Sequence, residues 1–387
     1  MQSSQGRKGA DKLRVLMINY EFPPVGGGAG NACYYMLREY ARYKNLEIDL
    51  VTFSPENRGY VENFSDNIRV FYVKAGEKKN LHYWTNTEML RWLFASLIFT
   101  RKHLKSKRYD LMHCWSGWPV GVIGLIHLKS MPYLVALRGS DIPGYSPRTK
   151  ALDWLLLRWI AKVVWARAAV VTVLSKDSAK LAKNTNSHIN FEVIYNGIDT
   201  TEFYPAESPF VGDKLRMLFV GRLIPRKGIR ELVRACQDLK GNFELSVIGA
   251  GKLEEEISQL VIDLKMADKI KLLGRISHEK LPEIYRQHDV FVMPSHNEAL
   301  GNVTQEAIAS GLALVTTDTG AAELLDGNGV IIEKEDVPDL ASKLQELVDD
   351  HELVSKYKQK SAKLGREMLW HKCCSEYYEQ YLKIINK

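Results

Sequence analysis

The feature that most restricts the possible folds is an alternation of short apolar segments with longer segments of helical periodicity. The short segments are rich in Val, Ile and Leu, and the alternation runs through most of the chain. This arrangement is typical of βα units, which build parallel sheets covered by helices. In the first half of the chain, strands are predicted at 13–19, 47–53, 68–73, 109–114, 133–138, 169–174 and 192–195.

A second series of βα units follows a loop rich in Pro and acidic residues at 199–213. Its strands are predicted at 216–221, 243–249, 269–274, 289–294, 312–317 and 329–333. A length of 387 residues also suits two domains better than one. We therefore predict two tandem Rossmann-like, doubly wound α/β domains. The expected divisions are a flexible leader at 1–11, an N-terminal domain at 12–205, a C-terminal domain at 206–368, and a helix at 369–387 that packs back across the domain seam.

Composition excludes several classes of protein. Apolar residues make up 45% of the chain and charged residues 26%, a balance typical of proteins with large cores rather than of disordered chains. The longest apolar stretch is interrupted by Arg158, Lys162 and Arg167, which argues against a transmembrane helix. The N-terminus lacks the apolar core of a signal peptide, and the five cysteines fit neither a disulfide framework nor a CxxC metal pattern. A cytoplasmic protein is expected.

The net charge of +7 is unevenly distributed along the sequence. Residues 1–200 contain 28 Lys and Arg against 16 Asp and Glu, whereas residues 201–387 contain 25 against 30. Opposite charges indicate that the two domains have different partners. The positive half could meet an anionic membrane surface or a phosphorylated substrate, although such an excess is usually a solvated face. Its basic residues do not form a recognisable nucleic-acid module, so no nucleic-acid partner is expected.

Ligands of open parallel sheets bind at the carboxyl ends of the strands, so the loops that follow strands are the candidate sites. The first such loop contains Gly26, Gly27 and Gly28 directly before a predicted helix. Glycines allow a close approach of the backbone to a ligand, and a helix N-terminus attracts anions. The spacing is not the GxGxxG of dinucleotide-binding proteins, and the loop alone fits a tight turn as well as a phosphate site.

A later loop, 217–228, places Arg222 after a strand and Lys227 before a helix. Both cations are therefore expected at one sheet edge, where a planar guanidinium and a compact ammonium suit phosphate oxygens. The alternative interpretation is a solvated, charged loop.

The segment 294–311 places Glu298 and Glu306 eight residues apart across a junction between a loop and a helix. Glu298 is expected before the helix and Glu306 just past its first turn. The helix N-terminus would direct backbone N–H groups at a phosphate, from Leu300, Gly301, Asn302 and Val303. In the alternative interpretation, Glu306 is an ordinary helical carboxylate and Glu298 a loop charge.

Together these segments resemble family-4 retaining glycosyltransferases of the GT-B fold. The similarity extends from Leu13 to the terminal helix and includes, in the family's order and spacing, the segments 175–181, 195–203, 220–228, 294–311 and 316–325. It implies transfer of a sugar from a nucleotide sugar, with the donor in the C-terminal domain and the acceptor mainly in the N-terminal domain. The implied pathway is surface polysaccharide or glycoconjugate biosynthesis.

The resemblance also implies roles for the charged residues. Glu306 matches the residue that holds the nucleotide ribose, and Glu298 the residue that supports the transferred sugar. Arg222 and Lys227 match the pair that neutralises the diphosphate. A UDP-sugar is the expected donor and a GDP-sugar the second choice. A non-hydrolysing nucleotide-sugar epimerase, which has the same two-domain architecture, is the alternative function.

On the N-terminal side, Gly27 and Gly28 match the glycines that approach the phosphate and sugar. Relatives often have His where this chain has Arg138, and a guanidinium cannot act as a general base, so Arg138 is expected to bind phosphate. Asp141 is expected to orient an acceptor hydroxyl, with an ion pair as the alternative. His113 is assigned to the acceptor side, with a structural histidine as the alternative.

The expected chemistry is metal-independent transfer with retention of configuration. A departing nucleoside diphosphate gains negative charge, which metal-dependent enzymes balance with a cation held by a D-x-D sequence. The chain contains no D-x-D, so no metal and no cofactor are expected. The predicted catalytic residues are Glu298, Arg222, Lys227 and Asp141.

The acceptor side carries one further signal. The segment 81–108 combines an apolar helix face with a basic end formed by Arg101, Lys102, Lys105, Lys107 and Arg108. An interfacial helix has this pattern, and so does a packed scaffold helix that ends in a basic turn. A glycan or polyprenyl-linked acceptor is expected, with peripheral association at the inner face of the cell membrane.

Overall fold

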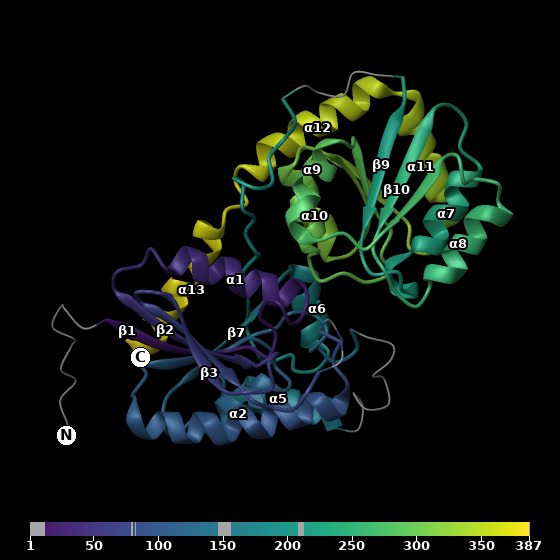
Figure 1. Cartoon of the computed structure of the whole chain (residues 1–387). Helices are drawn as coiled ribbons and strands as arrows, with labels where there is room; N and C mark the ends of the chain where they lie inside the picture. Colours follow the sequence, from purple (N-terminus) through teal and green to yellow (C-terminus); the bar gives the residue numbers. More distant parts are fainter. Residues whose placement is uncertain (1–11, 79, 82, 146–155, 208–212, 387) are drawn as a thin grey trace. The chain divides into compact units, whose positions relative to one another are not determined.

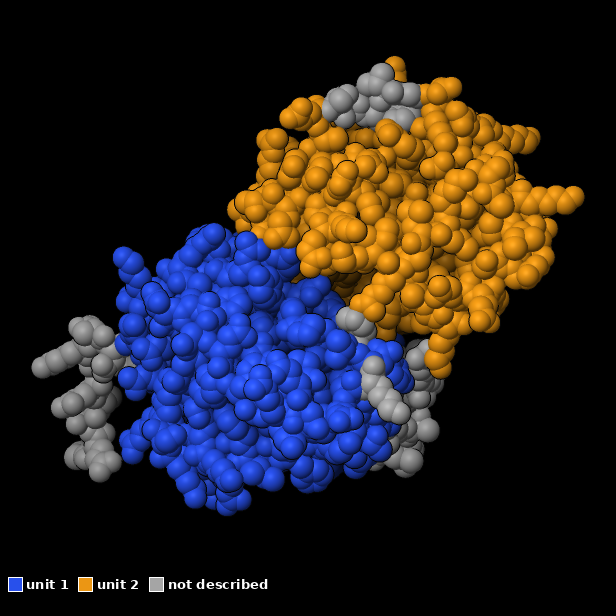
Figure 2. Space-filling view, in the orientation of Figure 1, with its two compact units in different colours: residues 1–174, 178–194, 370–387 blue, residues 175–177, 195–369 orange. Residues whose placement is uncertain are grey.

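The computed structural model describes residues 12–78, 80–81, 83–145, 156–207 and 213–386. The predicted leader, 1–11, lies outside these residues. The chain divides into two compact units, which Figure 2 distinguishes by colour. Unit 1 comprises Met1–Leu174, Ser178–Ile194 and Trp370–Lys387, and unit 2 comprises Ser175–Asp177 and Tyr195–Leu369.

The division falls at Ile194 and Tyr195 rather than near residue 205. The segment after Tyr195 packs into unit 2, where Phe203 is fully buried with its ring centroid 5.8 Å from that of Tyr285. The Pro-rich loop that suggested the later boundary therefore follows a segment that already belongs to unit 2.

Unit 1 is built on a sheet with the strand order β3-β4-β2-β1-β5-β6-β7-β8 (Figure 1). The strands are β1 (Leu13–Ile18), β2 (Leu46–Phe53), β3 (Tyr60–Ser65), β4 (Ile68–Val73), β5 (Leu111–Cys114), β6 (Tyr133–Ala136), β7 (Val170–Val173) and β8 (Phe191–Val193). In the centre, Val15 of β1 is in register with Ile48 on one side and Leu111 on the other. β3 pairs antiparallel with β4, and the sequence does not predict it because polar and apolar residues are mixed along it and none of them is buried.

Helices cover both faces of this sheet. They are α1 (Gly28–Tyr40), α2 (Asn86–Ser106), α3 (Val120–Ile126), α5 (Arg158–Arg167), α6 (Lys176–Lys183) and α13 (Trp370–Ile385). α1 and α13 pack together on one face, and α2, α3 and α5 form the layer on the other (Figure 1). α2 begins with a capping box, in which the Glu88 N–H donates to Thr85 Oγ1 over 3.2 Å and the Thr85 N–H to Glu88 Oε2 over 2.8 Å.

The terminal helix α13 is part of the core of unit 1. Its aromatic face, including Tyr377 and Tyr381, is buried among residues of β1, β2, β5 and α1. Tyr377 Oη lies 3.0 Å from Thr172 Oγ1 of β7. The cluster of aromatic residues near the end of the sequence thus completes the first hydrophobic core.

Unit 2 has a parallel sheet with the order β11-β10-β9-β12-β13-β14. The strands are β9 (Leu215–Val220), β10 (Phe243–Ile248), β11 (Ile270–Gly274), β12 (Val290–Met293), β13 (Ala313–Thr317) and β14 (Gly329–Ile332). The α-helices are α7 (Ile229–Gln237), α8 (Glu254–Asp263), α9 (Leu281–Arg286), α10 (Asn302–Ala309), α11 (Val337–Asp349) and α12 (His351–Gly365). The short 3-10 helices are η3 (Pro225–Lys227), η4 (His278–Lys280) and η5 (Gly320–Leu324).

One sheet that is parallel except for β3, one fully parallel sheet and the helices packed on them confirm the predicted α/β class. Among the described residues, no helix combines the length and the apolarity that are needed to cross a membrane.

Candidate active site

The turn between β9 and α7 brings cations to the carboxyl end of the second sheet. It contains η3, which ends at Lys227, and then Gly228, whose φ of +67° is a left-handed conformation. A Cβ at Gly228 would lie only 2.0 Å from the carbonyl oxygen of Pro294, the residue after β12. Glycine at this position therefore allows the loops after β9 and β12 to touch.

This contact places Lys227 beside Glu298. The Lys227 ammonium donates a hydrogen bond to Glu298 Oε2, and both residues are 8% exposed. Arg226 Nη1 lies 3.8 Å from the same carboxylate oxygen. The Arg226 guanidinium also donates to the carbonyl oxygen of Asn297, and the His296 N–H donates to the Arg226 carbonyl oxygen over 2.9 Å.

The electrostatics of this group favour an anion. Burial on its own would raise the pKa of Glu298, but the charges of Lys227, Arg226 and Arg222 lower that pKa below its ordinary value. Burial lowers the pKa of Lys227 even though Glu298 is its partner. Three cations act on one carboxylate, so the four residues together carry positive charge. The arrangement is suited to a phosphate or diphosphate.

Glu306 lies on α10 and is also buried, with 5% of its surface exposed. His278 Nε2 lies 3.0 Å from Glu306 Oε1, and the Tyr285 hydroxyl donates to Glu306 Oε2 over 3.0 Å. Burial alone would lower the pKa of His278, but the hydrogen bond and charge of Glu306 raise it above the ordinary value. The two partners come from η4 and α9, and they hold both oxygens of the carboxylate.

The loop between Glu298 and Glu306 ends at the N-terminus of α10. Gly301 precedes the helix with a φ of +81°, and no side chain caps this end. The first N–H groups of an α-helix have no acceptor within the helix, so this end attracts anions. Of the residues expected here, the side chain of Leu300 is fully buried, and Asn302 Oδ1 accepts a hydrogen bond from Asn196 Nδ2 over 2.9 Å. Val303 lies in the first turn of the helix.

In unit 1, the glycine loop leads directly into α1. Gly28 is the first residue of this helix and Gly27 precedes it. No atom lies within 4 Å of the position that a Cβ on Gly27 would occupy, so there is open space beside it. The Gly27 N–H donates to Glu21 Oε2 over 3.3 Å, which places a carboxylate at the end of α1 where the sequence predicts a phosphate. A direct contact of Gly27 and Gly28 with the donor stays a prediction.

Arg138 and Asp141 lie in the loop after β6. The guanidinium carbon of Arg138 is 4.5 Å from the centroid of the Trp115 ring, and Arg138 also hydrogen-bonds Tyr377. Asp141 Oδ1 accepts the Arg138 N–H over 2.8 Å, and Oδ2 accepts the Gly117 N–H over 2.7 Å. Burial raises the pKa of Asp141 above its ordinary value despite these hydrogen bonds and the charge of Arg138. Asp141 thus connects the loop after β6 to the loop after β5.

His113 is not placed for contact with an acceptor, and this part of the sequence interpretation is corrected. The residue is fully buried, with Nδ1 2.6 Å from the Tyr381 hydroxyl of α13 and its ring centroid 5.1 Å from that of Tyr377. Burial and the charge of Arg138 lower the pKa of His113 to about 3. It is a neutral core residue between β5 and the terminal helix.

The predicted residues therefore form two groups, one in each unit. Unit 2 contains Arg222, Lys227, Glu298, Leu300, Gly301, Asn302, Val303 and Glu306, and unit 1 contains Gly27, Gly28, His113, Arg138 and Asp141. The sequence analysis missed Arg226, His278, Tyr285 and Glu21. Arg226 and Glu21 are next to or within the motifs considered, whereas nothing near His278 or Tyr285 in the sequence indicates their contact with Glu306.

Within the part of the chain that the structure describes, no group of three or more His, Cys, Asp or Glu residues is arranged to hold a metal ion.

Comparisons with known proteins match both halves of the chain. The family described as Glycosyltransferase Family 4 matches residues 26–202, and the family described as Glycosyl transferases group 1 matches residues 200–364. A glycosyltransferase of Methanocaldococcus jannaschii is 27% identical over 367 residues, which cover 93% of this chain and 95% of the relative. A GDP-mannose-dependent monoacylated alpha-(1-6)-phosphatidylinositol monomannoside mannosyltransferase of Corynebacterium glutamicum is 28% identical over 368 residues, or 87% of this chain and 89% of the relative.

The fold also matches solved structures. Sucrose-phosphate synthase from Thermosynechococcus elongatus superimposes with a TM-score of 0.85 and covers 97% of this chain and 100% of that one, at 20% sequence identity. This similarity confirms the expected fold.

Proposed function

The chain belongs to the family-4 glycosyltransferases of the GT-B fold, and we propose that it transfers a sugar from a nucleotide sugar to a glycan or lipid-linked acceptor with retention of configuration. The proposed setting is the biosynthesis of a surface polysaccharide or glycoconjugate. A UDP-sugar is the favoured donor and a GDP-sugar the second choice.

The observation that carries this proposal is the pairing of Lys227 and Arg226 with Glu298 at the carboxyl end of the second sheet, where the charge of Arg222 also lowers the pKa of Glu298. A departing nucleoside diphosphate gains negative charge, and cations already in place would stabilise that charge as it develops. The low exposure of Lys227 strengthens this interaction, because less water screens it. Transfer is therefore proposed to need no metal.

The reaction breaks the bond between the anomeric carbon and the phosphate oxygen and forms a bond from that carbon to an acceptor hydroxyl oxygen. The leaving phosphate oxygen accepts the proton of that hydroxyl. Glu306 is proposed to hold the ribose and Glu298 to support the sugar. In unit 1, Asp141 is proposed to orient the acceptor and Arg138 to bind phosphate.

The names of relatives support two parts of the proposal. The mannosyltransferase of Corynebacterium glutamicum is named as GDP-mannose-dependent, and its acceptor is named as an acylated phosphatidylinositol mannoside. A lipid-linked acceptor is thus used by a relative that aligns along most of this chain. GDP-sugars accordingly stay beside UDP-sugars as donors to be tested.

Thermal-shift measurements with UDP-, GDP- and ADP-sugars test the donor. A ligand that binds only the folded protein raises its melting temperature, and the wild type should respond to one nucleotide more than to the others. Arg222→Ala should respond less than the wild type. If no nucleotide sugar changes the melting temperature, the donor assignment is wrong.

Incubation with the preferred nucleotide sugar alone tests the reaction class. A transferase needs an acceptor to consume its donor, whereas an epimerase converts the donor directly. Rapid conversion to an epimer would contradict the proposal. Excess EDTA should leave transfer unchanged, and loss of activity with rescue by Mg²⁺ or Mn²⁺ would contradict the metal-independent mechanism.

A further inference from the structure

The outer face of α2 exposes large apolar side chains to water. The opposite face packs towards the sheet and buries Trp92 and Ser96 completely. Leu90, Phe94 and Ile98 are 41%, 63% and 60% exposed. These three residues are spaced by four and therefore form one stripe along the helix.

The neighbouring helices of the same layer expose further apolar residues. α3 packs against both α2 and α5, on the face of the first sheet opposite α1 and α13 (Figure 1). Ile126 at the end of α3 is 56% exposed, and Trp159 on α5 is 66% exposed. Large exposed apolar residues that gather on one layer commonly mark a contact with a partner or a membrane.

The charges on this layer are almost all positive. Among the described residues of the three helices, Glu88 is the one acidic residue, and it is engaged by the capping box and by Lys78 over 3.2 Å. The exposed basic residues of these helices are Arg91, Arg101, Lys102 and Lys105 on α2 and Lys162 and Arg167 on α5. Arg108 and Lys129 are exposed in the loops that follow α2 and α3.

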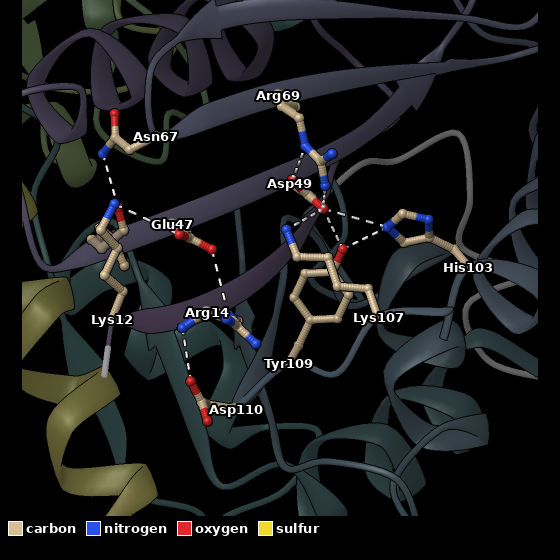
Figure 3. Close-up of polar contacts among 11 residues, drawn as sticks. Lys12, Arg14, Glu47, Asp49, Asn67, Arg69, His103, Lys107, Tyr109 and Asp110 are labelled. Atoms are coloured by element: carbon tan, nitrogen blue, oxygen red, sulfur yellow. Dashed lines mark hydrogen bonds and ion pairs between the residues drawn. The ribbon is translucent and has the colours of Figure 1, made fainter. Parts of the chain in front are cut away.

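The inner side of α2 is fixed to the sheet near its basic end. Lys107 Nζ lies 3.1 Å from Asp49 Oδ2, and His103 Nε2 lies 3.4 Å from the same oxygen (Figure 3). Lys107 therefore faces Asp49 and is not part of the exposed basic group that the sequence predicts. This anchor leaves Lys102 and Lys105 exposed on the other side of the helix.

We propose that the outer face of the α2, α3 and α5 layer docks on an anionic lipid bilayer. The aromatic and aliphatic side chains would enter the boundary between headgroups and acyl chains, while the surrounding cations meet lipid phosphates. The single sign of the charge distinguishes this face from most protein interfaces, in which charges of both signs are complementary to those of the partner. The inference does not depend on the proposed function, since vesicle binding needs neither donor nor acceptor.

Vesicle flotation with the full chain tests the docking surface. Vesicles of phosphatidylcholine alone are compared with vesicles of phosphatidylcholine and phosphatidylglycerol. The wild type should bind the anionic vesicles at least about tenfold more strongly, because each cation near such a surface contributes a factor of about five. An increase in ionic strength from about 0.1 M to about 1 M should remove most of this preference, since it shortens the screening length from about 10 Å to about 3 Å.

Paired variants separate the docking surface from general effects of charge and hydrophobicity. One double variant combines Lys102→Glu with Lys105→Glu, and a second combines Phe94→Ser with Ile98→Ser. Each of these two variants should bind anionic vesicles about tenfold or more weakly than the wild type. The apolar control is Ile262→Ser with Leu273→Ser in unit 2, where the native residues are 60% and 45% exposed. The charge control is Lys252→Glu with Lys334→Glu, also at exposed positions of unit 2. Both controls should bind the vesicles like the wild type.

Three results would overturn the inference. The first is that the wild type does not bind anionic vesicles at low ionic strength. The second is that both α2 variants bind these vesicles like the wild type. The third is that light scattering shows a wild-type dimer that Phe94→Ser with Ile98→Ser converts to a monomer, because a second copy would then cover this face. Thermal unfolding and transfer to a water-soluble acceptor, measured without vesicles, should be the same for the α2 variants and the wild type.

Discussion

The two units each contain a buried carboxylate surrounded by cations, and these two carboxylates differ in their surroundings. Asp49 of unit 1 is 2% exposed, and Arg69 binds it through two hydrogen bonds of 2.7 and 3.0 Å. Lys107, His103 and the Tyr109 hydroxyl also contact Asp49 (Figure 3). Glu298 of unit 2 is 8% exposed and pairs with Lys227 and Arg226 through one oxygen.

The positions of the two carboxylates in the fold explain the difference. Asp49 lies within β2, where its partners tie β4 and the end of α2 to the strand. Glu298 lies in a loop after β12, at the edge of a parallel sheet where ligands bind. A buried ion network alone therefore does not indicate an active site, and its place relative to the strand ends separates a structural role from a candidate catalytic one.

The largest expected effect distinguishes the cations of the two networks. Lys227→Ala and Arg222→Ala should each lower the rate of transfer about 10²- to 10³-fold, since a charge-assisted contact to a developing anion is worth about 2.7 to 4 kcal/mol. Lys107→Ala removes a cation from the Asp49 network and should leave kcat near that of the wild type. Steady-state kinetics of the three variants provides the measurement.

Arg222→Ala is the more informative of the two variants at the candidate site. Arg222 is exposed, so its removal should change the free energy of unfolding less than removal of Lys227, which leaves Glu298 buried beside one cation fewer. A fully active Arg222→Ala variant would contradict the electrostatic assignment. A similar loss of kcat in Lys107→Ala would show that the two networks do not differ as proposed.

The next effect is on stability. Asp49→Asn keeps the shape of the side chain and removes its charge, which leaves Arg69 and Lys107 without that partner. Loss of one member of a buried ion pair costs about 3 to 5 kcal/mol, and the partial exposure of both cations, 41% and 25%, reduces the expected loss to about 2 to 3 kcal/mol. Urea unfolding should show this loss while kcat of the folded enzyme stays within about twofold of the wild type. An unchanged midpoint would mean that the network does not stabilise unit 1.

The two units should also respond differently to pH. Burial alone would raise the pKa of Asp49, but hydrogen bonds from His103, Arg69, Tyr109 and Lys107 lower it well below the ordinary value. The stabilisation from Asp49 is thus present above pH of about 4 and is lost as the pH falls through the lower pKa of the folded state. The raised pKa of His278 has the opposite consequence. Its pairing with Glu306 stabilises the folded state below pH of about 6.5 and loses that contribution as the pH rises through the raised value.

Comparison with matched variants makes this difference measurable. The difference in unfolding free energy between the wild type and Asp49→Asn should shrink by about 2 kcal/mol on acidification. The difference between the wild type and His278→Ala should shrink by about 1 kcal/mol on alkalinisation. Urea unfolding at several pH values gives both differences. If the differences do not depend on pH, the ion pairs are not the source of the stabilisation.

The sequence predicts most of the fold because the βα alternation depends on local patterns. It misses β3, because polar and apolar residues are mixed along this strand and no continuous apolar segment marks it. It predicts correctly that Arg222 and Glu298 lie in the loops after β9 and β12, because these positions follow from the order of strands and helices. It does not predict that Tyr381 packs on His113, since 268 residues separate them and only the folded chain brings α13 to β5. The partners of Glu306 are only 21 and 28 residues away, and no local pattern predicts them either.

The smallest expected effect concerns one of those partners, Tyr285. Its hydroxyl donates to Glu306 Oε2 over 3.0 Å, and we expect this bond to hold the carboxylate in the orientation proposed for binding the ribose. Tyr285→Phe removes this hydrogen bond, worth about 1 kcal/mol, together with the contact of the hydroxyl with the Val303 carbonyl oxygen at 3.2 Å, so the KM for the donor should increase about fivefold while kcat changes less. Tyr72→Phe is a matched control in unit 1, because the Tyr72 hydroxyl donates to Glu62 Oε2 over 3.2 Å, and it should leave the donor KM unchanged.

A positioning role further requires that Tyr285→Phe has little additional effect on donor binding in a Glu306→Ala background, since residues that act through one another are not additive. If the two substitutions add fully, Tyr285 affects the donor by a route other than Glu306, and the ribose assignment of that carboxylate loses its structural support.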